Sequence, residues 1–321
     1  MKIIYSCPFI PAEWIAAHGL LPSRISAGSS TLKLGPGVCP YACSFAGAAI
    51  EEKTAAGVIV TTACDQMRRI YDVITENTDL SAFLMHVPHT WQTVEAQRLY
   101  ISELKRLGDF LIELGGNTPT PDILRQTMIE YNDNRAALRD LQGSLSPRDW
   151  ALRLSEFNRT GKFDQAIQDT KYTPSGVPVA LVGGPIPANQ CDIYDFIESA
   201  GGYVSLDATE TGERTLPAPF DRRLLKENPV SALIDSYFNT IYDAFRRPNN
   251  ELFKWLKLKL TERGVRGIIL RRYLWCDNWN AEAYRLKEWS GLPFTQIDAN
   301  DDGTVDVRTS SRIQAFMESI K

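Results

Sequence analysis

The residues best suited to metal or redox chemistry in this 321-residue chain are its cysteines, which are scattered along the sequence. No two of them have the Cys-x-x-Cys spacing that is typical of zinc ribbons and thioredoxin-type redox sites. Single, widely spaced cysteines are compatible with buried inert thiols or with ligands of a metal cluster that the fold assembles. The six are Cys7, Cys39, Cys43, Cys64, Cys191 and Cys276.

Two of the cysteines follow predicted strands. A β-branched run beginning at Gly57 predicts a buried strand that leads to Cys64 and Asp65, and a helical pattern follows. The same order of elements returns from Gly267 to Cys276, again with a helical segment behind it. Open α/β sheets bind ligands at the carboxyl ends of their strands. We therefore predict two α/β lobes that aim these cysteines at a common cleft.

A third cysteine stands at a predicted helix start. Cys39 follows the glycine-rich loop 35–37 and precedes a predicted helix that continues through Ile50. Unpaired amides and the helix dipole favour the thiolate form of a cysteine at this position. Cys39 is therefore a stronger ligand candidate than its residue type alone implies, and Cys43, one turn further along, could face the same way.

The elements around these motifs predict an α/β chain of two Rossmann-like lobes with parallel sheets. Residues 1–160 form the N-terminal lobe, which begins with a strand over 2–6 and carries a helical segment over about 91–157. The stretch 158–175 is polar and contains glycine and proline, so we place the lobe boundary there. Residues 175–321 then form the C-terminal lobe.

Composition argues against nucleic-acid and membrane partners. A hydrophobic content of 44% and a charged content of 23% are usual for soluble globular proteins. The net charge is −4 and no run of Lys or Arg occurs, so no basic footprint is present. No apolar stretch approaches the ~20 residues of a spanning helix. Pro8, Pro11 and Glu13 interrupt the N-terminal apolar stretch too early for a signal peptide, so we expect a cytoplasmic protein.

Taken together, the motifs resemble the family of 2-hydroxyacyl-CoA dehydratase D-components and benzoyl-CoA reductase iron–sulfur subunits, which includes the double-cubane cluster proteins. The similar blocks keep their order over nearly the whole chain. They are residues 6–13, 39–41, 63–69, Asp207 with 211–214, 274–277, and a tail running from 291 to 316.

The resemblance implies a helical insertion beside the lobes and an iron–sulfur cluster in the cleft between them. Carried over residue by residue, the ligands of a [4Fe–4S] cluster are Cys39, Cys64 and Cys276, and Ser6 and Glu13 are catalytic positions. Three ligands leave one iron open for water, a side chain or the thioester oxygen of an acyl-CoA substrate. The implied activity is radical dehydration or reduction of that acyl-CoA.

The family also implies partners. A low-potential electron comes from an ATP-dependent iron–sulfur activator protein, and the chain works as a homodimer or as a heterodimer with a related subunit. The sequence contains no Gly-x-x-x-x-Gly-Lys-Ser/Thr loop, which agrees with a separate protein binding the ATP.

The extra cysteines leave alternatives open. Cys43 and Cys191 exceed the usual ligand set, and with Cys7 all six thiols could face the cleft. Six thiols could hold an [8Fe–9S] double cubane, as in ATP-dependent reductases of small molecules. An electron-transfer or scaffold subunit is the third interpretation.

Overall fold

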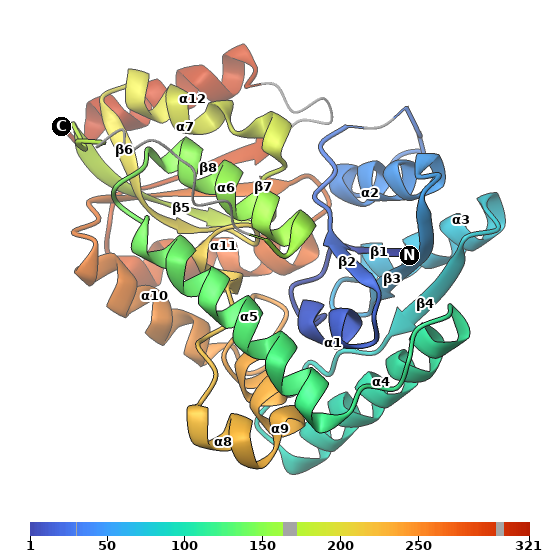
Figure 1. The fold of residues 1–321 in the computed structure, drawn as a ribbon. Coiled ribbons are helices and arrows are strands. Elements are labelled where there is room, and N and C mark those ends of the chain that lie inside the picture. The colour runs from blue at the N-terminus through green and yellow to red at the C-terminus, as the bar shows by residue number, and fades with distance from the viewer. Residues whose placement is uncertain (30, 163–171, 300–304) are drawn as a thin grey trace.

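The computed structural model, which describes residues 1–29, 31–162, 172–299 and 305–321, confirms an α/β fold in two lobes (Figure 1). Each lobe is built on a four-stranded parallel sheet. The first sheet contains β1 (Lys2–Tyr5), β2 (Leu21–Arg24), β3 (Ala55–Thr61) and β4 (Ser81–Met85). The second contains β5 (Val177–Gly183), β6 (Gly202–Ala208), β7 (Gly267–Tyr273) and β8 (Phe294–Ala299).

Both sheets have the same doubly wound topology. Their strand orders are β2-β1-β3-β4 and β6-β5-β7-β8, so in each lobe the second strand lies on one side of the first and the third on the other. This reversal creates a crevice outside the carboxyl ends of β1 and β3, and of β5 and β7. Open α/β sheets bind ligands at such points, so the topology alone nominates these four strand ends.

The strands form because their apolar side chains are buried on both faces. In β3, Val58 and Val60 pack into one core cluster and Ile59 into another. In β5, Val179 and Val182 likewise belong to different clusters. Successive strand residues point to opposite faces, and parallel sheets are covered by helices on both. The continuous β-branched runs of the sequence therefore correspond to two-sided burial.

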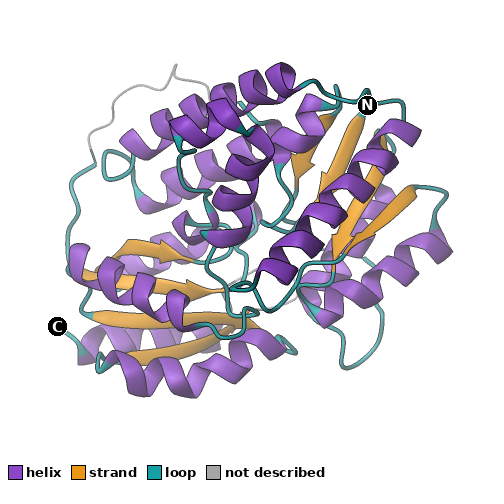
Figure 2. Cartoon of the chain, turned by 90° about the horizontal axis from the view of Figure 1, so that it is seen from below, coloured by secondary structure: helices purple, strands orange, loops and turns teal. Residues whose placement is uncertain are grey.

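Helices cover the sheets and fill the space between the lobes (Figure 2). None of the described helices is long and apolar enough to cross a lipid bilayer. They are α1 (Ala12–Ala17), α2 (Pro40–Glu51), α3 (Asp65–Asn77), α4 (Val94–Glu113), α5 (Pro121–Asp140), α6 (Pro147–Thr160), α7 (Asp192–Ser199), α8 (Arg222–Glu227), α9 (Pro229–Ile234), α10 (Asn250–Glu262), α11 (Asp277–Ser290) and α12 (Val307–Ser319).

The segment predicted to be helical contains α4, α5 and α6. Each of the three begins with a side chain that caps its first turn: Thr93, Thr120 and Ser146 accept hydrogen bonds from backbone N–H groups three residues ahead. Helix α6 packs on β2 of the first sheet and on β6 of the second, so it joins the lobes. The predicted boundary at 158–175 lies partly outside the described residues, and the division into domains stays a prediction.

One part of the C-terminal half returns to the N-terminal lobe. Side chains between Phe220 and Phe245 belong to the same core cluster as Ile3, Ile59 and Tyr100. Phe238, for example, stacks on Tyr100 with ring centroids 4.7 Å apart. The first sheet is therefore completed by residues that lie more than a hundred positions away in sequence.

Candidate active site at the carboxyl ends of both sheets

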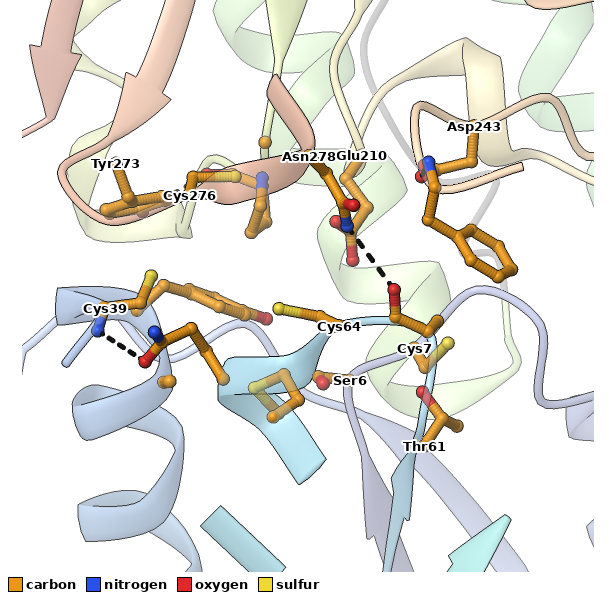
Figure 3. A pocket seen from close by; sticks show the side chains of 18 of the residues that line it. Ser6, Cys7, Cys39, Thr61, Cys64, Glu210, Asp243, Tyr273, Cys276 and Asn278 are labelled. Atoms are coloured by element: carbon orange, nitrogen blue, oxygen red, sulfur yellow. Dashed lines mark hydrogen bonds between the residues drawn. The ribbon is translucent and has the colours of Figure 1, made fainter. Parts of the chain in front are cut away.

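A pocket lies at the strand ends that the topology nominates (Figure 3). Residues 6–9 follow β1, residues 63 and 64 follow β3, residues 184 and 185 follow β5, and Cys276 follows β7, and all of them line it. Most of the other lining side chains are apolar or aromatic, among them Phe9, Met67, Phe245 and Trp279. The pocket thus combines an apolar wall with a few polar groups, as small-molecule sites do.

Three cysteines of this pocket occupy equivalent positions in three different helices. Cys39, Cys64 and Cys276 each stand at the N-cap, immediately before α2, α3 and α11. Figure 3 shows Cys39 and Cys64 on the wall formed by the first lobe and Cys276 on the opposite wall. Unpaired N–H groups and the positive end of the helix dipole favour negative charge at such positions. Three helix starts therefore face one small volume.

Local sequence explains how the helix starts are formed. Pro40 occupies the first position of α2, where its missing N–H costs nothing. Trp275 has a φ of +70°, the only positive φ among the described residues other than glycine. This left-handed residue turns the chain sharply at the end of β7, so that Cys276 begins α11 and faces the pocket.

Two amide side chains hold the three cysteine loops in register. The backbone N–H of Cys39 donates to Oε1 of Gln66 at 3.1 Å, which ties the start of α2 to α3. Nδ2 of Asn278, two residues after Cys276, donates to the carbonyl of Ala63 at 3.4 Å, which ties α11 to the end of β3. The relative positions of the cysteines are therefore fixed by the protein itself.

Burial is the main influence on the acidity of the three thiols. Burial raises the pKa of Cys39 to about 12, although the backbone N–H groups of Ala42 and Tyr41 oppose the rise. Burial also raises the pKa of Cys64 and of Cys276, and charge on neighbouring thiols adds to the rise for Cys39 and Cys276. Without a metal the thiols hold their protons at neutral pH, whereas bound iron deprotonates them.

Three cysteine thiols at one pocket are a donor set that an iron–sulfur cluster could use. In the described ranges no three Cys, His, Asp or Glu side chains are close enough to hold one metal ion. A cubane carries its irons at separate corners, so three thiols that surround a pocket without meeting at one point suit it. The N–H groups at the three helix starts are also available to sulfur, which lowers the energy of a negatively charged cluster.

Two of the remaining three cysteines do not line this pocket, so its lining gives no support to the open alternative that all six thiols face the cleft. Cys7 does line the pocket, and burial raises its pKa to about 12. Cys191 is 2% exposed and packs into the apolar core on one face of the second sheet. Cys43 lies in α2 and does not line the pocket. In the core of the second lobe, Cys191 packs with Val179 and Leu181 of β5 and with Ile193 of α7.

Of the two predicted catalytic residues, only one lies at the pocket. Ser6 follows β1 and lines the pocket. Glu13 in α1 does not line it; this carboxylate is completely buried and forms an ion pair with Arg135 of α5. The hydroxyl of Tyr237 donates a second hydrogen bond to Glu13 at 2.6 Å. A catalytic role for Glu13 stays a prediction, and its surroundings are those of a structural ion pair.

Sequence reasoning missed two carboxyl groups of the pocket, Glu210 and Asp243. Burial, and then the Asp243 carboxylate, raise the pKa of Glu210 to about 7. The strand-end rule could have identified Glu210, because it lies two residues after β6. Asp243 lies in an irregular loop and carries no comparable signal.

Comparison with known proteins gives one match over nearly the whole chain. The model of the family described as 2-hydroxyglutaryl-CoA dehydratase, D-component, matches residues 7–320. A benzoyl-CoA reductase subunit of Thauera aromatica is 27% identical over 162 residues, which cover 47% of this chain and 42% of the relative. The chain thus matches less than half of that relative's length.

Among solved structures, a mutant laminin-binding adhesin of Streptococcus agalactiae aligns over 100% of both chains. Its sequence identity is 10% and its TM-score is 0.22, a likeness too low to bear on fold or function.

Proposed function

Because the chain belongs to the 2-hydroxyglutaryl-CoA dehydratase D-component family, we propose that it is the iron–sulfur subunit of a 2-hydroxyacyl-CoA dehydratase or benzoyl-CoA reductase-like enzyme. The observation that carries the proposal is the meeting of Cys39, Cys64 and Cys276 at one pocket, each at the start of a different helix. Helix-start position and the family resemblance point to the same three thiols, and Cys64 and Cys276 in addition follow strand ends.

In this proposal the three cysteines hold a [4Fe–4S] cluster and leave one iron without a protein ligand. When bound, such a cluster supplies one-electron chemistry to a substrate at the open iron. The chain contributes the surroundings: the apolar wall with Phe9 and Phe245 excludes water, and Ser6 offers a hydroxyl at the pocket surface. Water exclusion strengthens every electrostatic interaction between the substrate and the protein.

We further propose an acyl-CoA as substrate and an ATP-dependent iron–sulfur activator as electron donor. The sequence has no phosphate-binding loop of the kind that couples ATP to work. A homodimer, or a heterodimer with a related subunit, completes the proposed enzyme. The matched relative is itself one subunit of its enzyme, which supports an assembly of more than one chain.

Of the alternatives, only the electron-transfer subunit is favoured by a specific observation. Cys7 is a fourth thiol at the pocket, and a cluster with four cysteine ligands would have no open iron for a substrate. The double cubane has no such support, because Cys191 packs in the core of the second lobe.

The decisive experiment is iron and sulfide analysis of anaerobically purified protein. We expect about four irons per chain, loss of iron in Cys39→Ala, Cys64→Ala and Cys276→Ala, and full iron content in Cys191→Ala as the matched control. Added acyl-CoA should change the electron paramagnetic resonance spectrum of the reduced cluster. A spectrum that is insensitive to acyl-CoA in the parent protein but sensitive in Cys7→Ala would favour the electron-transfer subunit.

Activity gives a second test. Turnover of an acyl-CoA should require both the activator and ATP, because in this proposal the activator couples ATP hydrolysis to the electron transfer. Turnover with neither of them would refute the proposed mechanism.

A further inference from the structure

The two carboxyl groups of the pocket differ in how they are held. Asp243 accepts a hydrogen bond from Nη1 of Arg214 at 2.5 Å and another from the backbone N–H of Phe245 at 3.0 Å. The carboxyl group of Glu210 makes no hydrogen bond and no ion pair with any residue that the structure describes. Figure 3 shows it pointing from the second lobe into the pocket, between Asn278 and Asp243.

The backbone at Glu210 is nevertheless firmly anchored. Its carbonyl accepts hydrogen bonds from Nη2 of Arg24 at 2.9 Å and from Oγ1 of Thr215 at 2.6 Å. The same guanidinium donates through Nε to the carbonyl of Ser6 at 2.9 Å. Arg24 thus fixes Glu210 of one lobe relative to Ser6 of the other. An anchored backbone with an unpaired side chain is the arrangement expected of a group that acts on a ligand and not on the fold.

We propose that Glu210 is the proton donor to the substrate in this pocket. The inference rests on the proposed function and adds an acid–base residue to it. Asp243 is the weaker candidate because its carboxyl group is already engaged by Arg214 and by the backbone N–H of Phe245. The pKa of Glu210, near 7 for the reasons given above, suits a group that gives and regains a proton at neutral pH.

The step balances for both candidate reactions. In dehydration, the O–H bond of Glu210 breaks and its proton joins the hydroxide that leaves the substrate carbon with the bonding electron pair, so water departs. The Glu210 carboxylate then takes up the proton lost from the adjacent substrate carbon, and no proton is consumed overall. In ring reduction, two electrons from the ATP-dependent activator and two protons add to the ring. The O–H bond of Glu210 breaks to give one proton to a ring carbon, the second proton comes from solvent, and the Glu210 carboxylate regains its proton from solvent water.

The test compares Glu210→Gln with Glu213→Gln in the anaerobic, cluster-loaded protein with activator and ATP, using 2-hydroxyglutaryl-CoA and benzoyl-CoA as probes. Glu213 is a matched control because it also follows β6, but it faces Arg263 at 3.2 Å and does not line the pocket. We expect Glu210→Gln to lower kcat by about 100-fold or more with little change in KM, the usual size of an acid–base contribution. Iron content and the cluster spectrum should stay at parent values in both variants.

Infrared spectroscopy provides a second test of the donor role that does not depend on turnover. The infrared difference spectrum between parent protein and Glu210→Gln should contain the C=O band of a protonated carboxyl group, shifted in deuterium oxide. Glu210→Asp retains an acid but withdraws it by one methylene, so it should be slower than the parent and faster than Glu210→Gln. This variant decides the question if Glu210→Gln does not fold or load.

The outcomes separate the two proposals. Parent-like turnover by Glu210→Gln, or by Glu210→Asp if the former does not fold, overturns the donor role and leaves the proposed function standing. Absence of the infrared carboxyl band overturns the donor role as well. Failure of the parent protein to act on either probe overturns the proposed function, and the donor role with it.

Discussion

Replacing Glu13 with glutamine tests whether this carboxylate supports the fold or the chemistry. Glu13 is completely buried, and Arg135, its ion-pair partner, is 1% exposed. Nε and Nη2 of Arg135 have no hydrogen-bond partner within the described residues, so the buried charge is compensated by the Glu13 carboxylate and by the Phe220 ring, whose centroid is 5.0 Å away. Removing one member of such a pair costs about 3–5 kcal/mol, because the other charge stays buried. We expect Glu13→Gln to lower the free energy of unfolding by about 3 kcal/mol, since glutamine keeps the shape and one acceptor.

Urea unfolding followed by tryptophan fluorescence measures this loss, and Trp14 lies next to Glu13 in α1. A double-mutant cycle with Arg135→Met isolates the pair. The double variant should be more stable than the sum of the single losses indicates, because it leaves no unpaired charge behind. Glu130→Gln, at an exposed position of α5, is the control and should change stability by less than about 0.5 kcal/mol.

The opposite pattern would refute this reasoning. If Glu13→Gln unfolds at the same urea concentration as the parent, loads its cluster and yet loses turnover, then Glu13 acts in catalysis. The buried pair would in that case contribute nothing measurable to stability. Glu13 would also have to reach the pocket through a conformational change in the working enzyme.

Three further predictions follow from single contacts. Gly183→Ala should abolish folding of the second lobe, as measured by circular dichroism, because φ is +141° there and a Cβ would lie 1.8 Å from the carbonyl oxygen of Arg271. Cys191→Val should retain the parent's iron content and its stability within about 1.5 kcal/mol, as a similarly sized apolar replacement in a core. Lys2 and then Thr54 hydrogen-bond to Glu52 and hold its pKa at about 2, below its value in the unfolded chain, so this contribution is present above about pH 4.5 and is lost as pH falls toward 2. The difference in unfolding free energy between parent and Lys2→Met should therefore shrink on acidification over that range.

Local sequence order establishes the parts of the site that depend on neighbouring residues. A β-branched run, then Cys64, then an amphipathic segment can only place the thiol between a strand end and a helix start, and the structure has β3, Cys64 and α3 in that order. The same holds for β7, Cys276 and α11. Because parallel strands present their carboxyl ends at one edge of a sheet, local order also indicated which edge carries the site.

Which side chains share that edge depends on how the elements pack in three dimensions. Cys191 also stands at a helix start, yet it faces the core, because the direction of a side chain depends on how α7 packs against the second sheet. Glu13 finds its partners in Arg135 and Tyr237, which are 122 and 224 positions away, and no local pattern encodes such pairs. Glu210 follows β6 in the sequence, but the anchoring of its backbone by Arg24 of the other lobe depends on how the lobes pack together. The periodicity of the sequence indicates which side chains each segment buries. Which residues face each other across a pocket depends instead on how the two sheets pack together.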